Sequence, residues 1–113
     1  MPAYKIMQIV ASESTPEKEE EFTKWYSENH LPMLFGYEGV KRASRYQLMG
    51  DDDSNARFLA VYEFNSKEDL DAFPDSQAFK DAITDFDNNH EALGFKMKWV
   101  AVYELITELE RAE

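Results

Sequence analysis

Four stretches with the pattern of β-strands alternate with two stretches with the pattern of helices, in the order strand, helix, strand, strand, helix, strand. The expected strands are residues 4–11, 40–49, 57–64 and 95–106, and the expected helices are residues 16–30 and 66–93, the second interrupted at Pro74. This order is typical of the split βαβ, or ferredoxin-like, arrangement, in which both helices cover one face of a four-stranded antiparallel sheet. We therefore predict an α+β fold with βαββαβ topology, in a single domain that spans residues 1–113.

The first expected helix carries one of the two histidines of the chain on an aromatic face. One side of this helix is lined, at the i, i+3, i+4 spacing of a helical face, by Phe22, Trp25, Tyr26, Asn29, His30 and Met33. A residue that precedes a proline is disfavoured in the helical conformation, so Leu31 and Pro32 predict a helix end near His30. Among side chains, histidine has the unperturbed pKa closest to neutrality, which makes an inward-facing His30 the leading candidate for a proton carrier.

The sheet face that the helices leave uncovered is also expected to be apolar. In the last strand, for example, strict alternation places Met97, Trp99 and Tyr103 on one face and Val100 and Val102 on the other. An exposed apolar face of that size exceeds what monomers normally tolerate. The simplest cover is the same face of a second copy, so we predict an isologous homodimer with a closed, barrel-like core: a dimeric α/β barrel.

Composition argues against several classes of partner and chemistry. The net charge of −11 speaks against nucleic acids and anionic membranes, which proteins bind through clustered Lys and Arg. The lack of cysteine excludes disulfides, thiolate metal sites and a cysteine nucleophile. Neither a signal-peptide pattern nor an apolar run of about 20 residues is present, so we expect a cytoplasmic protein without membrane contacts. Neither histidine has a histidine one helical turn away and residues 51–55 lack the calcium-loop pattern, so no metal or cofactor is expected.

Two motifs resemble those of a known superfamily. They are Phe22-x-x-Trp25-Tyr26-x-x-x-His30-x-Pro32 and Gly39-Val40-x-Arg42-Ala43-x-Arg45-Tyr46, and both are similar to the dimeric α/β-barrel superfamily, in particular its EthD-like branch. The resemblance covers essentially the whole chain. It implies a ferredoxin-like subunit with a pocket between helices and sheet, into which His30 points. That superfamily includes cofactor-free polyketide cyclases, muconolactone isomerases and quinone-forming monooxygenases, beside many members without an assigned activity. Glu38 stands where the pattern commonly has proline, so the loop beside the pocket entrance is expected to differ.

On this resemblance, His30 and Tyr26 are the catalytic candidates. The C-terminal end of a helix favours imidazolium while an aromatic pocket penalises it, and the balance would leave His30 a general acid/base with a pKa near neutrality. The alternative is a buried histidine that bonds a carbonyl and merely ends the helix. Candidate substrate-binding residues are Trp25, Arg45, Tyr46, Tyr62, His90, Trp99 and Tyr103.

Each of these binding candidates also has a structural alternative. The tyrosines would donate to a carbonyl or enolate oxygen, or pack in the core or the dimer interface. The tryptophans would stack on a planar substrate, or pack in the core. Arg45 would hold a substrate carboxylate in a bidentate contact, or form a surface salt bridge. His90 would be a second pocket histidine, or simply close its helix.

Three functions remain open from the sequence. In the first, a cofactor-free lyase, isomerase or cyclase acts on a small, largely apolar carbonyl compound: His30 moves a proton α to the carbonyl and a tyrosine stabilises the enolate. The second is a cofactor-independent monooxygenase acting on an electron-rich aromatic compound. The third is a dimeric binding or stress-related module without turnover. Replacing His30 by alanine or glutamine separates enzyme from module.

Overall fold

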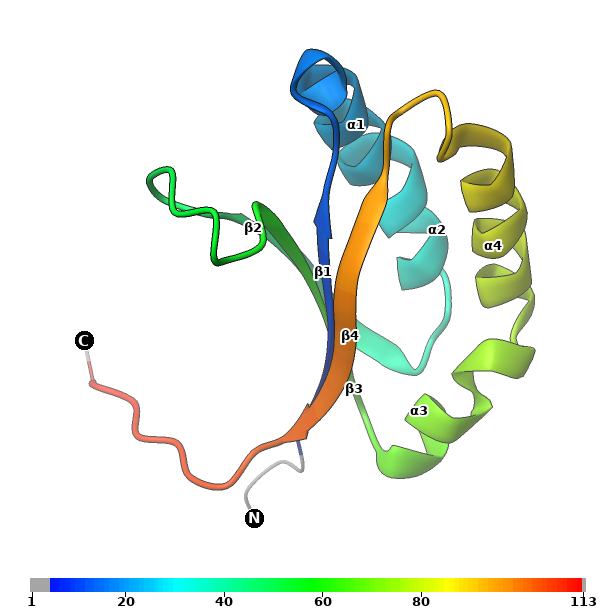
Figure 1. Cartoon of the computed structure of the whole chain (residues 1–113). Helices are drawn as coiled ribbons and strands as arrows, with labels where there is room; N and C mark the ends of the chain where they lie inside the picture. Colours follow the sequence, from blue (N-terminus) through cyan, green and yellow to red (C-terminus); the bar gives the residue numbers. More distant parts are fainter. Residues whose placement is uncertain (1–4, 113) are drawn as a thin grey trace.

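The computed structural model describes residues 5–112 and shows an antiparallel sheet with its helices on one face (Figure 1). The strands are β1 (Ile6–Glu13), β2 (Val40–Gln47), β3 (Phe58–Phe64) and β4 (Lys96–Glu104), in the spatial order β2-β3-β1-β4. All neighbouring pairs are antiparallel, and β1 lies between β3 and β4. The predicted α+β, ferredoxin-like fold is therefore confirmed. Tyr4, which we placed in the first strand, lies outside the described residues.

Two helical segments cover one face of this sheet. The first contains a 3₁₀ turn (Pro16–Lys18), α1 (Glu19–Trp25), a π-turn (Tyr26–His30) and α2 (Leu31–Phe35), and the second contains α3 (Lys67–Ala72), a 3₁₀ turn (Phe73–Asp75) and α4 (Gln77–Asn89). Ser66 and Ser76 cap α3 and α4, where their hydroxyl oxygens accept hydrogen bonds from backbone N–H groups. None of the helices within residues 5–112 has the length and apolar character that crossing a membrane requires.

The prediction that the first helical segment ends at His30 is wrong. The chain widens into the π-turn, where the Leu31 N–H donates to the Tyr26 carbonyl five residues back, and then continues as α2 to Phe35. Pro32 stands just after the π-turn, which already interrupts the regular hydrogen-bond ladder, so its missing N–H has little cost there. His30 therefore lies within a helical segment and not at a C-terminal end that would favour imidazolium.

The wide turn also changes which residues face the core after Tyr26. Asn29 and Met33, which regular helical spacing turns inward, are exposed. His30 is buried as expected, and Leu34 is buried in place of Met33. The π-turn has more residues per turn than an α-helix. The inward positions from Tyr26 onward are therefore each four residues apart, at His30 and Leu34, and the three-residue positions Asn29 and Met33 face outward.

A β-bulge in β4 overturns a second sequence-based expectation. Ala11 of β1 pairs with Trp99, but the next residue, Ser12, pairs with Met97, so Lys98 has no partner in the register. The extra residue turns Met97 toward the helices and Trp99 toward the open face of the sheet. Strict alternation, which placed both side chains on one face, fails here.

The face of the sheet opposite the helices remains open in the single chain (Figure 1). Tyr46, Trp99 and Tyr103 lie on this face with 58%, 43% and 50% of their surface exposed. The C-terminal segment after β4 leaves the sheet on the same side (Figure 1). The helical layer therefore covers one face of the sheet, and the other face has no cover within the described chain.

Candidate active site

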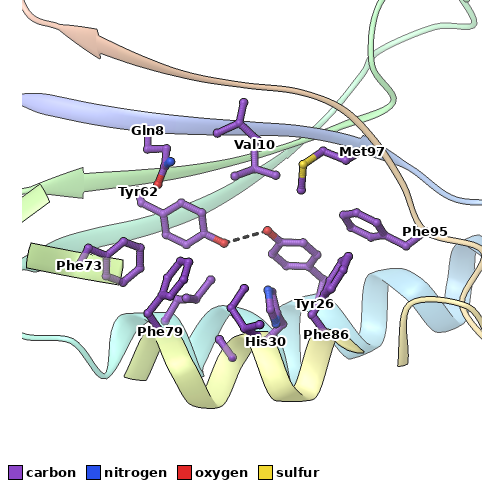
Figure 2. Close-up of a pocket in the computed structure, with 14 residues that line it drawn as sticks. Gln8, Val10, Tyr26, His30, Tyr62, Phe73, Phe79, Phe86, Phe95 and Met97 are labelled. Atoms are coloured by element: carbon purple, nitrogen blue, oxygen red, sulfur yellow. Dashed lines mark hydrogen bonds between the residues drawn. The ribbon is translucent and has the colours of Figure 1, made fainter. Parts of the chain in front are cut away.

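A cavity of about 210 Å³ lies between the helices and the helix-covered face of the sheet (Figure 2). Four of its lining residues carry a polar group: Gln8, Tyr26, His30 and Tyr62. The others are Val10, Leu34, Phe73, Phe79, Ala82, Ile83, Phe86, Phe95, Met97 and Val100. The cavity is thus an apolar space with a small polar group of residues, which is the usual composition of a small-molecule site.

His30 is held tightly at the wall of the cavity. Its ring stacks on Trp25 with centroids 4.7 Å apart and meets the Tyr26 ring edge-on at 5.0 Å. Its Nδ1 lies 3.7 Å from Oδ2 of Asp85 on α4, and neither atom has a hydrogen-bond partner among the described residues. The second oxygen of Asp85 accepts a hydrogen bond from Asn89 at 3.0 Å, which orients the carboxylate.

Burial lowers the pKa of His30 below its ordinary value, because the apolar surroundings penalise imidazolium. Asp85 acts in the opposite direction and offsets part of this effect through its negative charge. We expected a helix end to offset the effect of burial on the His30 pKa. In the structure, the carboxylate of Asp85 has this role instead. The lowered pKa therefore favours the neutral imidazole, which is able to accept a proton.

Two tyrosine hydroxyls meet at the sheet side of the cavity (Figure 2). Tyr26 from the π-turn and Tyr62 from β3 are hydrogen-bonded through their hydroxyl oxygens at 2.8 Å, and both side chains are buried. Burial raises the pKa of both phenols, that of Tyr62 well above its ordinary value. Both are therefore neutral, and since one proton serves their mutual bond, the other is available to a ligand oxygen.

The remaining candidates from the sequence lie outside the cavity lining. Trp25 is behind the His30 ring, and Arg45 is behind Tyr26, with its guanidinium carbon 4.7 Å from the ring centre. His90 stacks on Phe86 at the end of α4, with centroids 4.8 Å apart. Tyr46, Trp99 and Tyr103 lie on the open face of the sheet. Of the predicted residues, the structure brings together Tyr26, His30 and Tyr62.

Sequence reasoning missed two polar residues of this site, Gln8 and Asp85. Gln8 is the cross-strand neighbour of Tyr62 and presents an amide to the cavity (Figure 2). A single amide side chain within the apolar sequence of a central strand could have indicated a polar residue in the site. Asp85 follows Ala82 by three residues on α4, but its pairing with His30 joins two separate helices, and nothing local in the sequence indicates that contact.

We expect Asp85→Asn to lower the pKa of His30 further, because the change removes the charge that favours imidazolium and leaves the burial penalty. An NMR titration of the His30 ring protons measures this, with the His90 signals as an internal reference.

The folded pKa of His30 is below its unfolded value of about 6.5, so the unfolded chain binds the proton first. Stability should accordingly fall as the pH drops below about 6.5, over a wider range in the variant. An unchanged His30 titration would show that Asp85 does not act on the ring.

Several solved structures share the fold of this chain. The fold is similar to an EthD-family protein from Bacillus halodurans (TM-score 0.68, 11% identity, 91% of this chain and 99% of that chain). It is also similar to HapK from Hahella chejuensis (TM-score 0.70, 11% identity, 96% and 99%). A third similar structure is a dimeric ferredoxin-like protein of unknown function from Thermobifida fusca (TM-score 0.58, 14% identity, 95% and 94%). These likenesses show the fold: the predicted ferredoxin-like fold is confirmed, and the similar structures include an EthD-family protein, as the resemblance in sequence predicted.

A family model identifies the chain more closely. Residues 4–100 match the family described as Domain of unknown function (DUF4286), and the chain belongs to this family. No curated protein sequence matches it.

Proposed function

We propose that the protein is a cofactor-free enzyme of the lyase, isomerase or cyclase type, acting on a small, largely apolar carbonyl compound. The observation that carries this proposal is the convergence of a neutral imidazole and a hydrogen-bonded tyrosine pair on one apolar cavity. The imidazole supplies a base, the phenols supply hydrogen-bond donors, and the apolar walls exclude water from both.

In the proposed reaction, His30 removes the proton α to the substrate carbonyl. Nδ1 faces Asp85, which leaves Nε2 for the cavity. The electron pair of the broken C–H bond moves to the carbonyl oxygen, and a hydroxyl of the Tyr26–Tyr62 pair donates to the resulting enolate. The nearby carboxylate of Asp85 stabilises the imidazolium formed in this step. Return of the proton from Nε2 to carbon or oxygen restores the neutral ring.

The walls of the cavity support an apolar substrate with few oxygens. Besides the tyrosine pair, Gln8 is the polar contact on the sheet side, suited to a second oxygen of the ligand. Ile83, Met97 and Val100 line the cavity but are 42%, 53% and 43% exposed, so they form its rim between α4 and the edge strand β4. This rim suits an alkyl or aryl group that extends from the reacting carbonyl.

Proton exchange in D₂O tests the proposal. An alkyl β-keto ester is incubated with the protein, and loss of its α-proton signal is followed by NMR. We expect exchange above the buffer rate that saturates with ester concentration. Saturable binding without faster exchange, over β-keto esters and ketones of several chain lengths, would favour a binding module and contradict the enzymatic proposal.

We propose further that two copies cover each other's open sheet faces. Three exposed aromatic side chains on this face, Tyr46, Trp99 and Tyr103, support the proposal, because a monomer rarely exposes such a patch. The similar protein from Thermobifida fusca is described as dimeric.

The double variant Trp99→Asp/Tyr103→Asp is expected to be monomeric. In an isologous interface each substitution occurs twice, so four carboxylates would have to be buried without partners. Sedimentation equilibrium should give about twice the chain mass of 13.2 kDa for the unaltered protein and the chain mass for the variant. Phe35→Asp, which changes an exposed aromatic residue on α2, is the matched control and should remain dimeric. A double variant that stays dimeric would place the interface elsewhere.

A further inference from the structure

Arg45 lies on β2 with its guanidinium directed under the first helical segment, outside the cavity. Its guanidinium carbon is 4.7 Å from the ring centre of Tyr26, 5.1 Å from that of Phe58 and 5.5 Å from that of Phe22. All three distances are within the range of cation–π attraction. Tyr26 is therefore held between the cavity on one side and a cation on the other.

The same guanidinium is bonded to the backbone that carries Tyr26. Nη1 donates to the Thr23 carbonyl at 3.2 Å and to the Ser27 hydroxyl at 2.9 Å, one contact before and one after Tyr26 along the chain. A π-turn displaces the helical ladder by one residue and weakens its regular bonding at that point. The Thr23 carbonyl, which also accepts from the Tyr26 N–H, thus gains a charged donor where the turn begins.

No carboxylate of the described residues neutralises the charge of Arg45. Within residues 5–112 no ion pair to Arg45 is found, and its Nη2 is buried without a hydrogen bond. The neighbouring arginines differ, since Arg57 pairs with Glu19 at 3.3 Å and Arg42 with Glu63 at 3.7 Å. A cation that approaches Tyr26 this closely, without a counter-ion among residues 5–112, acts on the phenols themselves.

We propose that Arg45 is a positioning residue that fixes Tyr26 and the π-turn and favours negative charge on the Tyr26–Tyr62 hydroxyls. This inference rests on the proposed function, because the hydroxyls matter as donors to an enolate oxygen. The other ionisable groups at the pair are His30 in the same turn and, beyond it, Asp85 on α4. Arg45 counteracts part of the effect of burial, which raises the pKa of both phenols.

The test is the ionisation of a trifluorotyrosine placed at position 26, followed by fluorine NMR. Fluorination lowers the phenol pKa into a range where the protein stays folded. Arg45→Met keeps an apolar stem over the ring but removes the charge and the donors, and Arg45→Lys keeps the charge without the planar fork. We expect an ionisation constant about tenfold lower in Arg45→Met and near the original value in Arg45→Lys. Arg57→Met, with its cation paired to Glu19, is the control and should leave the titration unchanged.

Proton exchange by the same variants separates this inference from the function itself. We expect Arg45→Met to lower kcat about tenfold with little change in KM, because the lost charge acts mainly when the enolate forms. Suppose that the unaltered protein catalyses exchange but Arg45→Met leaves the trifluorotyrosine ionisation constant unchanged. This result would overturn the role of Arg45 alone. A moved titration in a protein without exchange would overturn the proposed function and leave the effect of Arg45 on the phenols standing. If Arg45→Met does not fold, the ionisation constant in Arg45→Lys decides. A value that differs about tenfold or more from the original would overturn the charge effect, and a value near the original would support it.

Discussion

His30→Gln is expected to slow α-proton exchange by at least about 100-fold while the chain remains folded. Glutamine is polar and of similar length, so it fills the space between Trp25 and the cavity, but its amide is not basic at any accessible pH. Gln8 and the tyrosine pair still line the cavity, and substrate binding should change far less than kcat. Saturating NMR exchange assays with the β-keto ester measure both quantities.

His90→Gln is the matched control for this experiment. His90 packs on Phe86 at the end of α4, outside the cavity lining, and its replacement should leave the exchange rate within a few-fold of the original. A His30→Gln protein that exchanges at the original rate would remove His30 from the mechanism. A His30→Gln chain that fails to fold would instead favour the alternative in which the buried ring only completes the core.

The fold was accessible from the sequence because its signals are local. The order of strand and helix patterns, the serine caps of α3 and α4 and the inward face of α1 all depend on residues close together in the chain. The two errors arose where an extra residue enters a regular element, at the π-turn before Leu31 and at Lys98 in β4. Sequence spacing alone does not show such insertions, since they are stabilised by tertiary packing.

The candidate site could be predicted only in part, because several of its contacts join residues that are distant in the sequence. His30 and Tyr26 follow from helical spacing, because the four-residue step between them still faces inward within the π-turn. The sequence offered Tyr62 as a candidate but could not show that it faces the cavity while Tyr46 and Tyr103 do not. The face of a strand residue depends on the register with neighbouring strands. The pairing of Tyr62 with Gln8 places it on the helix side.

Asp85 and Arg45 show the same limit for charged residues. Their roles depend on contacts between elements that are distant in sequence: α4 with the π-turn, and β2 with α1. We expected Arg45 to bind a carboxylate at the surface or in the pocket, and the structure places its guanidinium against aromatic rings. These two residues bring opposite charges to opposite sides of Tyr26 and His30, which suits a site where a base gains positive charge and an oxygen gains negative charge.

Phe22→Ala is expected to lower the free energy of unfolding by about 3–5 kcal/mol, the largest stability effect that we predict for one substitution. Phe22 is 0% exposed, and its ring lies 5.8 Å from that of Tyr26 and 5.5 Å from those of Phe58 and Phe95. A domain of this size is stable by about 5–15 kcal/mol, so the variant would lose a large part of its margin.

Denaturant unfolding, followed by far-UV circular dichroism, measures this loss. The protein concentration must be fixed, because association of the chain would add to its apparent stability. Phe35→Ala is the matched control: this ring is 52% exposed, and its loss should change stability by no more than about 0.5 kcal/mol. Equal effects of the two substitutions would mean that the α1 face does not form the core. A large effect of Phe22 alone would show that the packing that supports Tyr26 and Arg45 also supports the fold, so that the site and the core share one set of aromatic contacts.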